Sequence, residues 1–386
     1  MYFPMRYYPL GFLCVLLGLF SCNEKEKGDS PISFRLVLED SIKVDHLGNL
    51  YLLDYDKKEQ KYLLANESYY DYLEVNDQGE KLYAGSIPVD GPDAVDMVIG
   101  MGYYQSKVGI ATGTSGFKIF DGGQIVDEIS IPYGYSSFSF LPQLGLNSWN
   151  DGVLYPRFTA DSLMNDGFTE DFYSKSYSLP LFEFQRPGEP LRNLISLPKD
   201  SPFLDGNYHG SLVLAYELLE NDLYLINWVR PEVIKYQRIE DDFQVVKTVD
   251  LEIENWISYD PVPFANASDF YASFRLKMPG SVRTIQSLGE LILVQYQAGI
   301  SEEDFAKLLD ENGRPQPDLV SQLNPTLVAI LDQELNVISK GLRLPESVNG
   351  EFIINAQGQI VVSKNPNLSA IEDEGIILYK LRLVQE

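Results

Sequence analysis

Apolar and polar residues alternate one by one along most of this chain, in short runs separated by Gly, Asn and Asp turns. Alternation with a period of two places successive side chains on opposite faces of a strand. A polar turn followed by a β-rich run recurs, as in HLGNLYLLDY, WNDGVLYPRF, ENDLYLINW, LGELILVQY and AQGQIVVSK. Several runs stop at an apolar residue and a proline, which cannot donate to a strand ladder. The pattern predicts an all-β protein built from repeated units.

Strand units of about 40 to 60 residues are typical of the blades of a β-propeller, because one blade cannot bury both of its faces alone. Division into four-stranded blades gives the ranges 42–87, 95–131, 138–197, 212–253, 282–344 and 351–383. The last range contains three clear strands, and the segment 32–38 is one strand without a blade. If this N-terminal strand completes the last blade, it closes a six-bladed β-propeller and protects the sheet edges. Five or seven blades are the alternatives.

The predicted connections differ in length according to their place in the blade. Connections from the first to the second strand and from the third to the fourth are short. The long connections join second to third strands or one blade to the next, at 159–179, 198–210, 254–281 and 297–325. In a propeller these two kinds lie at one rim, so we predict that this rim carries a binding surface. The alternative is that long loops are merely tolerated there.

Aromatic residues are concentrated in two of these long connections, PKDSPFLDGNYHG and ENWISYDPVPFANASDFYASF. Aromatic rings at a rim can stack on sugars or hold peptides. Alternatively, the rings fold the connection down onto the propeller, because long loops need a core of their own. The candidate binding residues are Tyr208, His209, Trp256, Tyr259, Phe270 and Tyr271.

The connection at 297–325 contains a predicted helix, SEEDFAKLLDENG. Ser301 and Asp304 form a capping pair, and Gly313 can end the helix. Phe305, Leu308 and Leu309 share one face, which we expect to pack on the propeller; binding of a partner is the alternative.

Charge and chemistry narrow the classes of function. The chain has 56 acidic and 30 basic residues, a net charge of −26, so we predict no nucleic-acid partner. It has two histidines, His46 and His209, and two cysteines, too few for the usual His and Cys ligands of a zinc site, so we predict none. Its acidic clusters lack the order of a calcium loop, and no nucleophile elbow or HExxH motif occurs. We therefore expect no metal, no cofactor and no catalytic residue.

The N-terminal segment LGFLCVLLGLFSC is too short for a membrane span of about 20 apolar residues. Arg6, the apolar stretch and Ser21 before Cys22 are the parts of an export signal. Leu19-Phe20-Ser21-Cys22 resembles the lipobox of bacterial lipoproteins, although Phe20 replaces the usual small residue. The resemblance implies cleavage before Cys22, with lipid on its thiol and an acyl group on its amine. A buried N-terminal strand or helix is the alternative.

The predicted domain organisation is a lipoprotein signal peptide at 1–21, a charged tether at 22–31 and one propeller domain at 32–386. Through the lipobox residues and the apolar-Pro strand ends, the whole chain resembles uncharacterised propeller lipoproteins of Bacteroidota. This resemblance implies a lipid anchor in the outer membrane, on its periplasmic or external face. It implies no activity, because the family has none established.

The expected function is a cell-envelope binding protein that recognises a peptide, glycan or protein partner at the long-loop rim. The alternative is an exported propeller hydrolase or lactonase with a metal ion on the axis. That enzyme would need carboxylates and Asn side chains converging from several first strands. A rigid structural subunit of an envelope complex is a third hypothesis, and it would show an apolar patch.

Overall fold

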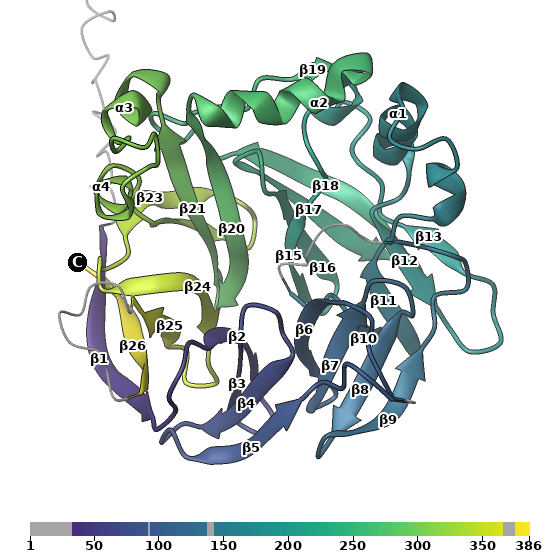
Figure 1. Cartoon of the computed structure of the whole chain (residues 1–386), viewed down its shortest axis with the longest axis horizontal. Helices are drawn as coiled ribbons and strands as arrows, with labels where there is room; N and C mark the ends of the chain where they lie inside the picture. The colour runs from purple at the N-terminus through teal and green to yellow at the C-terminus, as the bar shows by residue number, and fades with distance from the viewer. Residues whose placement is uncertain (1–32, 92, 137–142, 366–374) are drawn as a thin grey trace, which may run out of the picture.

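The computed structural model describes residues 33–91, 93–136, 143–365 and 375–386. In these ranges, six four-stranded antiparallel sheets surround a common centre (Figure 1). The protein is a six-bladed β-propeller, and the predicted fold is confirmed. None of the helices in these ranges is long and apolar enough to cross a membrane.

Five blades follow the chain in order, with the first strand of each nearest the centre. Blades 1 and 2 contain β2 (Tyr51–Asp56), β3 (Lys61–Ala65), β4 (Asp71–Asn76), β5 (Lys81–Ser86), β6 (Val98–Tyr104), β7 (Lys107–Thr112), β8 (Phe117–Asp121) and β9 (Gln124–Ile129). Blades 3, 4 and 5 contain β10 (Asn147–Trp149), β11 (Gly152–Pro156), β12 (Phe182–Gln185), β13 (Arg192–Leu194), β15 (Leu214–Leu219), β16 (Asp222–Asn227), β17 (Glu232–Ile239), β18 (Asp242–Asp250), β20 (Met278–Leu288), β21 (Leu291–Ile300), β22 (Leu327–Asp332) and β23 (Val337–Arg343).

The sixth blade joins the two ends of the chain. It contains β24 (Val348–Ile354), β25 (Ile360–Lys364), β26 (Ile376–Gln385) and, as its outer strand, β1 (Phe34–Val44). β1 runs antiparallel to β26, from Phe34 opposite Gln385 to Val44 opposite Ile376. The predicted closure by the N-terminal strand is therefore confirmed. Because β24 contacts both β2 and β20, the ring of first strands is continuous at this point.

The boundary between β1 and blade 1 was predicted wrongly. Residues 42–44 belong to β1, so blade 1 begins at Tyr51 and the DHLG turn connects two blades. A bulge between Leu38 and Asp40 shifts the register and lets the strand continue along β26. Ile42 and Val44 are then buried against blade 1, which explains why their alternation resembled a strand of that blade.

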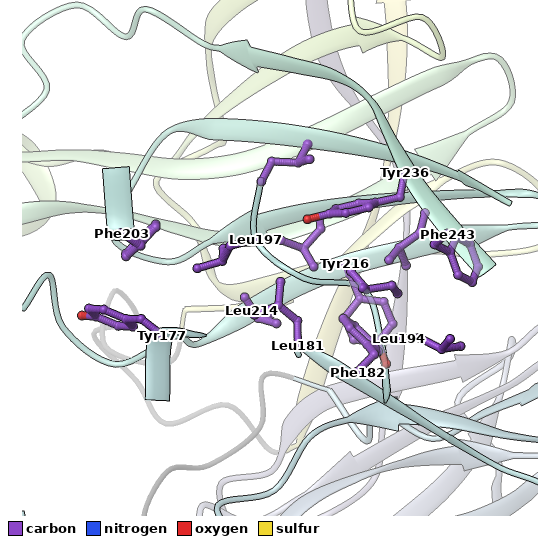
Figure 2. Close-up of a cluster of buried hydrophobic side chains, with 14 of the residues drawn as sticks. Tyr177, Leu181, Phe182, Leu194, Leu197, Phe203, Leu214, Tyr216, Tyr236 and Phe243 are labelled. Atoms are coloured by element: carbon purple, nitrogen blue, oxygen red, sulfur yellow. The ribbon is translucent and has the colours of Figure 1, made fainter. Parts of the chain in front are cut away.

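The apolar core lies between adjacent blades, since each sheet must cover both of its faces. Figure 2 shows the cluster between blades 3 and 4, where side chains of both sheets point toward one another. Phe182 of β12 is fully buried and packs edge-to-face on Tyr216 of β15, with ring centroids 4.9 Å apart. This packing holds the base of the rim insertions described below.

All helical segments of the described chain lie in connections between second and third strands or between blades. They are η1 (Asp161–Met164), α1 (Glu170–Ser178), η2 (Pro202–Leu204), η3 (Phe264–Asn266), α2 (Ala267–Phe270), η4 (Tyr271–Arg275), α3 (Glu302–Lys307) and α4 (Pro317–Leu323). The short strands β14 (Asn207–Tyr208) and β19 (Val262–Pro263) lie in the same connections. The topology places these connections at one rim, and Figure 1 shows α1, α2 and α3 along the upper side of the molecule.

The predicted helix at 301–313 is shorter in the structure. Ser301 caps α3 by accepting a hydrogen bond from the Asp304 amide at 3.3 Å, as expected. The helix ends at Lys307 because Asp310 Oδ1 accepts the amides of Asn312 and Arg314, both at 2.8 Å. Such a turn competes with helical hydrogen bonding. Phe305 and Leu308 pack with Ile300, so the apolar face is docked as predicted.

Candidate functional site

The six candidate binding residues come from two insertions that pack on one another. β14 pairs with β19, with Tyr208 opposite Val262. The ring of Phe270 lies 5.2 Å from Tyr208 and stacks on Tyr259 at 5.6 Å. The structure therefore joins both insertions through one aromatic cluster.

Within this cluster the candidates differ in exposure. Phe270 is 2% exposed and lines neither of the cavities described below that hold the other five candidates. Tyr208 is largely buried, whereas Tyr271 is 48% exposed. Much of the cluster is thus the core of the insertions themselves. Tyr208 and Tyr271 line one cavity, and His209, Trp256 and Tyr259 line another.

The first cavity, which we call the α1 cavity, has a volume of about 390 Å³. Its walls come from the end of β11 and the residues after it, from α1, from the stretch between Tyr208 and Leu214, and from Tyr271. The aromatic side chains of the wall are Phe158, Phe168, Phe172, Tyr173, Tyr177, Tyr208, Tyr216 and Tyr271. Gln143, from the connection between blades 2 and 3, completes the wall. Three long insertions and this fourth connection therefore build one largely apolar hollow at the rim.

Hydrogen bonds from Tyr177 fix two walls of the α1 cavity relative to each other. Its hydroxyl donates to the Gly210 carbonyl at 2.6 Å and accepts the His209 amide at 2.7 Å. The ring of Tyr177 lies almost parallel to that of Tyr208, at 6.1 Å. Tyr177 thus ties α1 to the loop before blade 4. At the Tyr271 wall, the hydroxyls of Tyr208 and Tyr271 are 3.0 Å apart.

Arg157 supplies the charge of the α1 cavity. Its Nε donates to the Pro180 carbonyl at 2.9 Å, and its amide donates to the Leu181 carbonyl at 3.0 Å. Burial lowers the pKa of Arg157, while the nearby Tyr133 and Glu183 oppose that shift. An arginine remains charged at neutral pH even so. The cavity therefore contains a partly buried cation.

Glu183, on β12, lies near Arg157 but outside the cavity wall. Its two carboxylate oxygens accept the Tyr133 hydroxyl at 3.0 and 2.9 Å. Burial raises the pKa of Glu183, and Tyr133 and Arg157 oppose the increase. No ion pair joins Arg157 and Glu183 within 4 Å among the residues that the structure describes. The carboxylate is therefore held chiefly by tyrosine.

The second cavity, which we call the Trp256 cavity, has a volume of about 420 Å³ and mixed charge. His209, Trp256 and Tyr259 share its wall with Arg230, Asp250 and Glu252. The His209 ring nitrogen Nε2 lies 3.0 Å from Asp205 Oδ1, and its backbone is held by Tyr177. His209 thus has structural partners on both sides.

A third cavity, of about 550 Å³, lies beside α4 and contains none of the candidate residues. Its wall is rich in amide side chains, including Gln297 and Asn324. The cation in it, Arg343, already pairs with Glu346 at 2.6 Å. This cavity is therefore polar, and Glu346 of its own wall neutralises the charge of Arg343.

Carboxylates also occur on three first strands near the centre of the ring: Asp54 on β2, Glu217 on β15 and Glu351 on β24. Asp54 accepts the Tyr103 amide of blade 2 at 2.7 Å, and Glu217 accepts the Ser287 amide of blade 5 at 3.2 Å. Burial raises the pKa of Asp54 to about 6 and that of Glu351 to about 7.

These central carboxylates bear on the hydrolase alternative. In the described ranges, no three His, Cys, Asp or Glu side chains form a group that could hold a metal ion. Asp54 and Glu217 are instead bonded to the neighbouring first strands, where they tie blades together. The convergence of ligands that the axial-metal enzyme requires is thus not found among the described residues.

The sequence reasoning missed Arg157 and the aromatic residues of α1. The segment 159–179 was recognised as a long connection without a helix. Thr169 caps α1 by accepting the Phe172 amide, and Glu170 and Asp171 follow in the first turn. Tyr173 and Tyr177, four residues apart, share a face. This capping pattern was the signal available in the sequence. For Arg157 there was none, because its place depends on tertiary contacts.

Comparisons with known proteins show the fold. The chain matches the crystal structure of a DUF4221 family member from Bacteroides vulgatus, with a TM-score of 0.63, 11% identity, and coverage of 92% of this chain and 100% of that one. A protein of unknown function from Bacteroides caccae matches with a TM-score of 0.41, 12% identity, and coverage of 82% and 94%. No protein-family model matches the chain. A search of curated proteins gives no match either. The expected resemblance to uncharacterised Bacteroidota propellers is thus confirmed at the level of the fold.

Proposed function

We propose that this protein is a lipid-anchored binding protein of the cell envelope that holds its ligand in the α1 cavity. The observation that carries the proposal is the cavity itself, a largely apolar hollow of about 390 Å³ built chiefly by three insertions at one rim. Ligand sites are typically concave, mostly apolar and formed before the ligand arrives. The expected ligands are a peptide, a glycan or a protein. A hollow of this size can hold a small molecule or one chemical group of such a larger partner.

The cavity is prepared for binding because its walls are fixed without a ligand. Tyr173 and Tyr208 pack at 4.6 Å, and Tyr177 joins α1 to Gly210 by a hydrogen bond. Tyr177 and Tyr208 belong to the same buried cluster as the core between blades 3 and 4, part of which Figure 2 shows. A preorganised site loses little conformational entropy when it binds.

The lipid anchor on Cys22 is proposed from the sequence alone. Cys22, the signal peptide at 1–21 and the tether at 22–31 lie outside the described residues. The first described strand, β1, begins at Phe34, close behind the tether. A lipid on Cys22 would then hold the propeller at the outer membrane, with the membrane and an envelope ligand as its partners.

Binding in the α1 cavity can be tested with the neutral fluorescent probe N-phenyl-1-naphthylamine and the Cys22→Ser chain. We expect saturable fluorescence enhancement, because the probe leaves water for an apolar wall. Ser176, which lines the cavity, is replaced by Trp to fill it; Ser174→Trp, on the exposed side of α1, is the control. Loss of binding in Ser176→Trp alone supports the proposal. Equal enhancement in all three chains would contradict it.

A further inference from the structure

We propose that the α1 cavity selects small organic anions, that is, ligands that combine one carboxylate-type group with an aromatic or aliphatic body. This inference deepens the proposed function and rests on it. It assigns Arg157 as the residue that receives the anionic group and the aromatic wall as the part that holds the body.

The first support is the contrast between the cavity and the rest of the chain. The protein carries 56 acidic residues and a net charge of −26. Yet none of the described residues lining the α1 cavity is Asp or Glu, and Arg157 is the one charged side chain among them. In the other two cavities, acidic residues accompany the arginine. The α1 cavity is therefore a local positive site in a negative protein, and charge complementarity favours an anion.

The second support is the way Arg157 is held. Its amide and Nε are bonded to the carbonyls of Leu181 and Pro180. These bonds fix the base of the guanidinium, and within the described chain its two terminal nitrogens have no hydrogen bond. The planar fork of arginine matches a carboxylate with two parallel hydrogen bonds. Arg157 lines the cavity, so its two terminal nitrogens are the donors that this residue can offer to a ligand there.

Glu183 does not take the place of a ligand carboxylate as the ion-pair partner of Arg157. Its carboxylate is engaged by the Tyr133 hydroxyl through both oxygens, and it is not part of the cavity wall. Burial of a cation is costly where no acid pairs with it at close range, and Arg157 is partly buried. A ligand carboxylate beside Arg157 would supply that partner and offset the cost.

The remaining wall selects the body of the ligand. Phe158, Phe172 and Leu181 give it apolar surface. Gln143 is the one side-chain amide of the described wall, and there is no carboxylate. The remaining polar side chains of the wall are hydroxyls, of which those of Tyr177, Tyr208 and Tyr271 are already near protein partners. An aromatic or aliphatic body needs no polar partner in the wall and covers its apolar surface.

The experiment is an isothermal titration of the Cys22→Ser chain with 1-naphthaleneacetate and with its neutral isostere, 1-naphthaleneacetamide. We expect the acid to bind at least tenfold more tightly than the amide. Arg157→Met should bring the two affinities within about twofold, since it removes the charge and keeps the length of the side chain. Arg275→Met, an exposed arginine of the same rim, makes the same charge change and should keep the preference.

The outcomes separate this inference from the function on which it rests. Equal binding of acid and amide in the unsubstituted cavity would overturn the inference even if Arg157→Met does not fold. If Ser176→Trp still abolishes both, the proposed binding site stands. If the preference for acid survives Ser176→Trp, the anion binds elsewhere and the inference fails. Binding of neither compound, or tighter binding of N-acetylglucosamine than of the acid, would also overturn it.

A further titration distinguishes two possible sources of the ligand carboxylate, the C-terminus of a peptide and a free organic acid. The peptide Ac-Gly-Ser-Gly-Phe is titrated with a free and with an amidated C-terminus. Binding of the free-terminus peptide as tight as that of 1-naphthaleneacetate would support a peptide end as the natural source. Binding of 1-naphthaleneacetate alone would support a free organic acid.

Discussion

At the scale of single residues, Tyr177 shows how one side chain positions the α1 cavity. Its hydroxyl is both donor and acceptor, to Gly210 and from His209, and the residue is 4% exposed. Two backbone groups of the loop before blade 4 thus depend on one buried oxygen.

Replacement of Tyr177 by Phe should lower the free energy of unfolding by about 1–3 kcal/mol, because it leaves a buried amide and a buried carbonyl without a partner. Urea unfolding followed by far-UV circular dichroism measures the change. Tyr51→Phe, at an exposed tyrosine whose hydroxyl makes no hydrogen bond in the described chain, should change it by less than about 0.5 kcal/mol. Equal effects of both substitutions would argue against this role of Tyr177.

Glu351 makes stability depend on pH. Burial raises its pKa from 4.5 to about 7, so the folded protein binds a proton that the unfolded chain has released. The stabilising contribution of protonated Glu351 is complete below about pH 4.5 and is lost as the pH rises through about 7. Asp54, whose pKa burial raises to about 6, acts in the same direction.

Glu351→Gln should therefore raise the free energy of unfolding at pH 8 by an amount on the order of 1–3 kcal/mol, and much less at pH 4.5. Thermal unfolding at the two pH values measures this difference. Glu311→Gln removes a charge at an exposed site and serves as the control for net charge. A gain of equal size at both pH values would contradict the linkage.

At the scale of elements, the strands could be predicted well and the helices poorly. Alternation located the strands because one face of each meets the neighbouring blade. The boundary at 42–44 was predicted wrongly because the strand continues along β26 beyond the register shift at the bulge, so its alternation does not end there. α1 was missed because it is short and its aromatic face packs on other insertions. α3 was overextended because the turn at Asp310 competes with the helix.

Ser301→Ala should open α3 locally, because the cap accepts one of the free amides at the start of the helix. We expect the amides of α3 to exchange hydrogen about five- to tenfold faster, corresponding to about 1 kcal/mol. Hydrogen exchange followed by mass spectrometry resolves this segment. Ser174→Ala, on the exposed side of α1, should leave the exchange of α3 unchanged; unaltered exchange in Ser301→Ala would refute the capping role.

At the scale of the whole molecule, the ring could be predicted from the repeated strand units, and the elaborated rim from the lengths of the connections. The composition of the α1 cavity did not, because it brings together side chains from 143 to 271 through tertiary packing. The six candidates fell near one another because their insertions share a rim. Which of them face a cavity was decided by the pairing of β14 with β19 and by the core around Phe270.

The proposed lipid anchor predicts that the protein leaves the membrane fraction when Cys22 is replaced. Cys22→Ser removes the thiol that would carry the lipid, so the protein should move from the membrane fraction to the soluble fraction of lysed cells. Ser21→Ala, which keeps the cysteine and a small residue before it, should remain with the membranes. If the Cys22→Ser protein still sediments with the membranes, the lipid anchor is wrong.

The most direct test of the account is to map where an organic acid binds. Hydrogen exchange of the Cys22→Ser chain is measured with and without saturating 1-naphthaleneacetate. We predict slower exchange in α1 and in the segment 208–214, with no change in the strands of blade 1. Protection confined to the Trp256 cavity or to the central strands, or no protection anywhere, would contradict the assignment of the α1 cavity as the binding site.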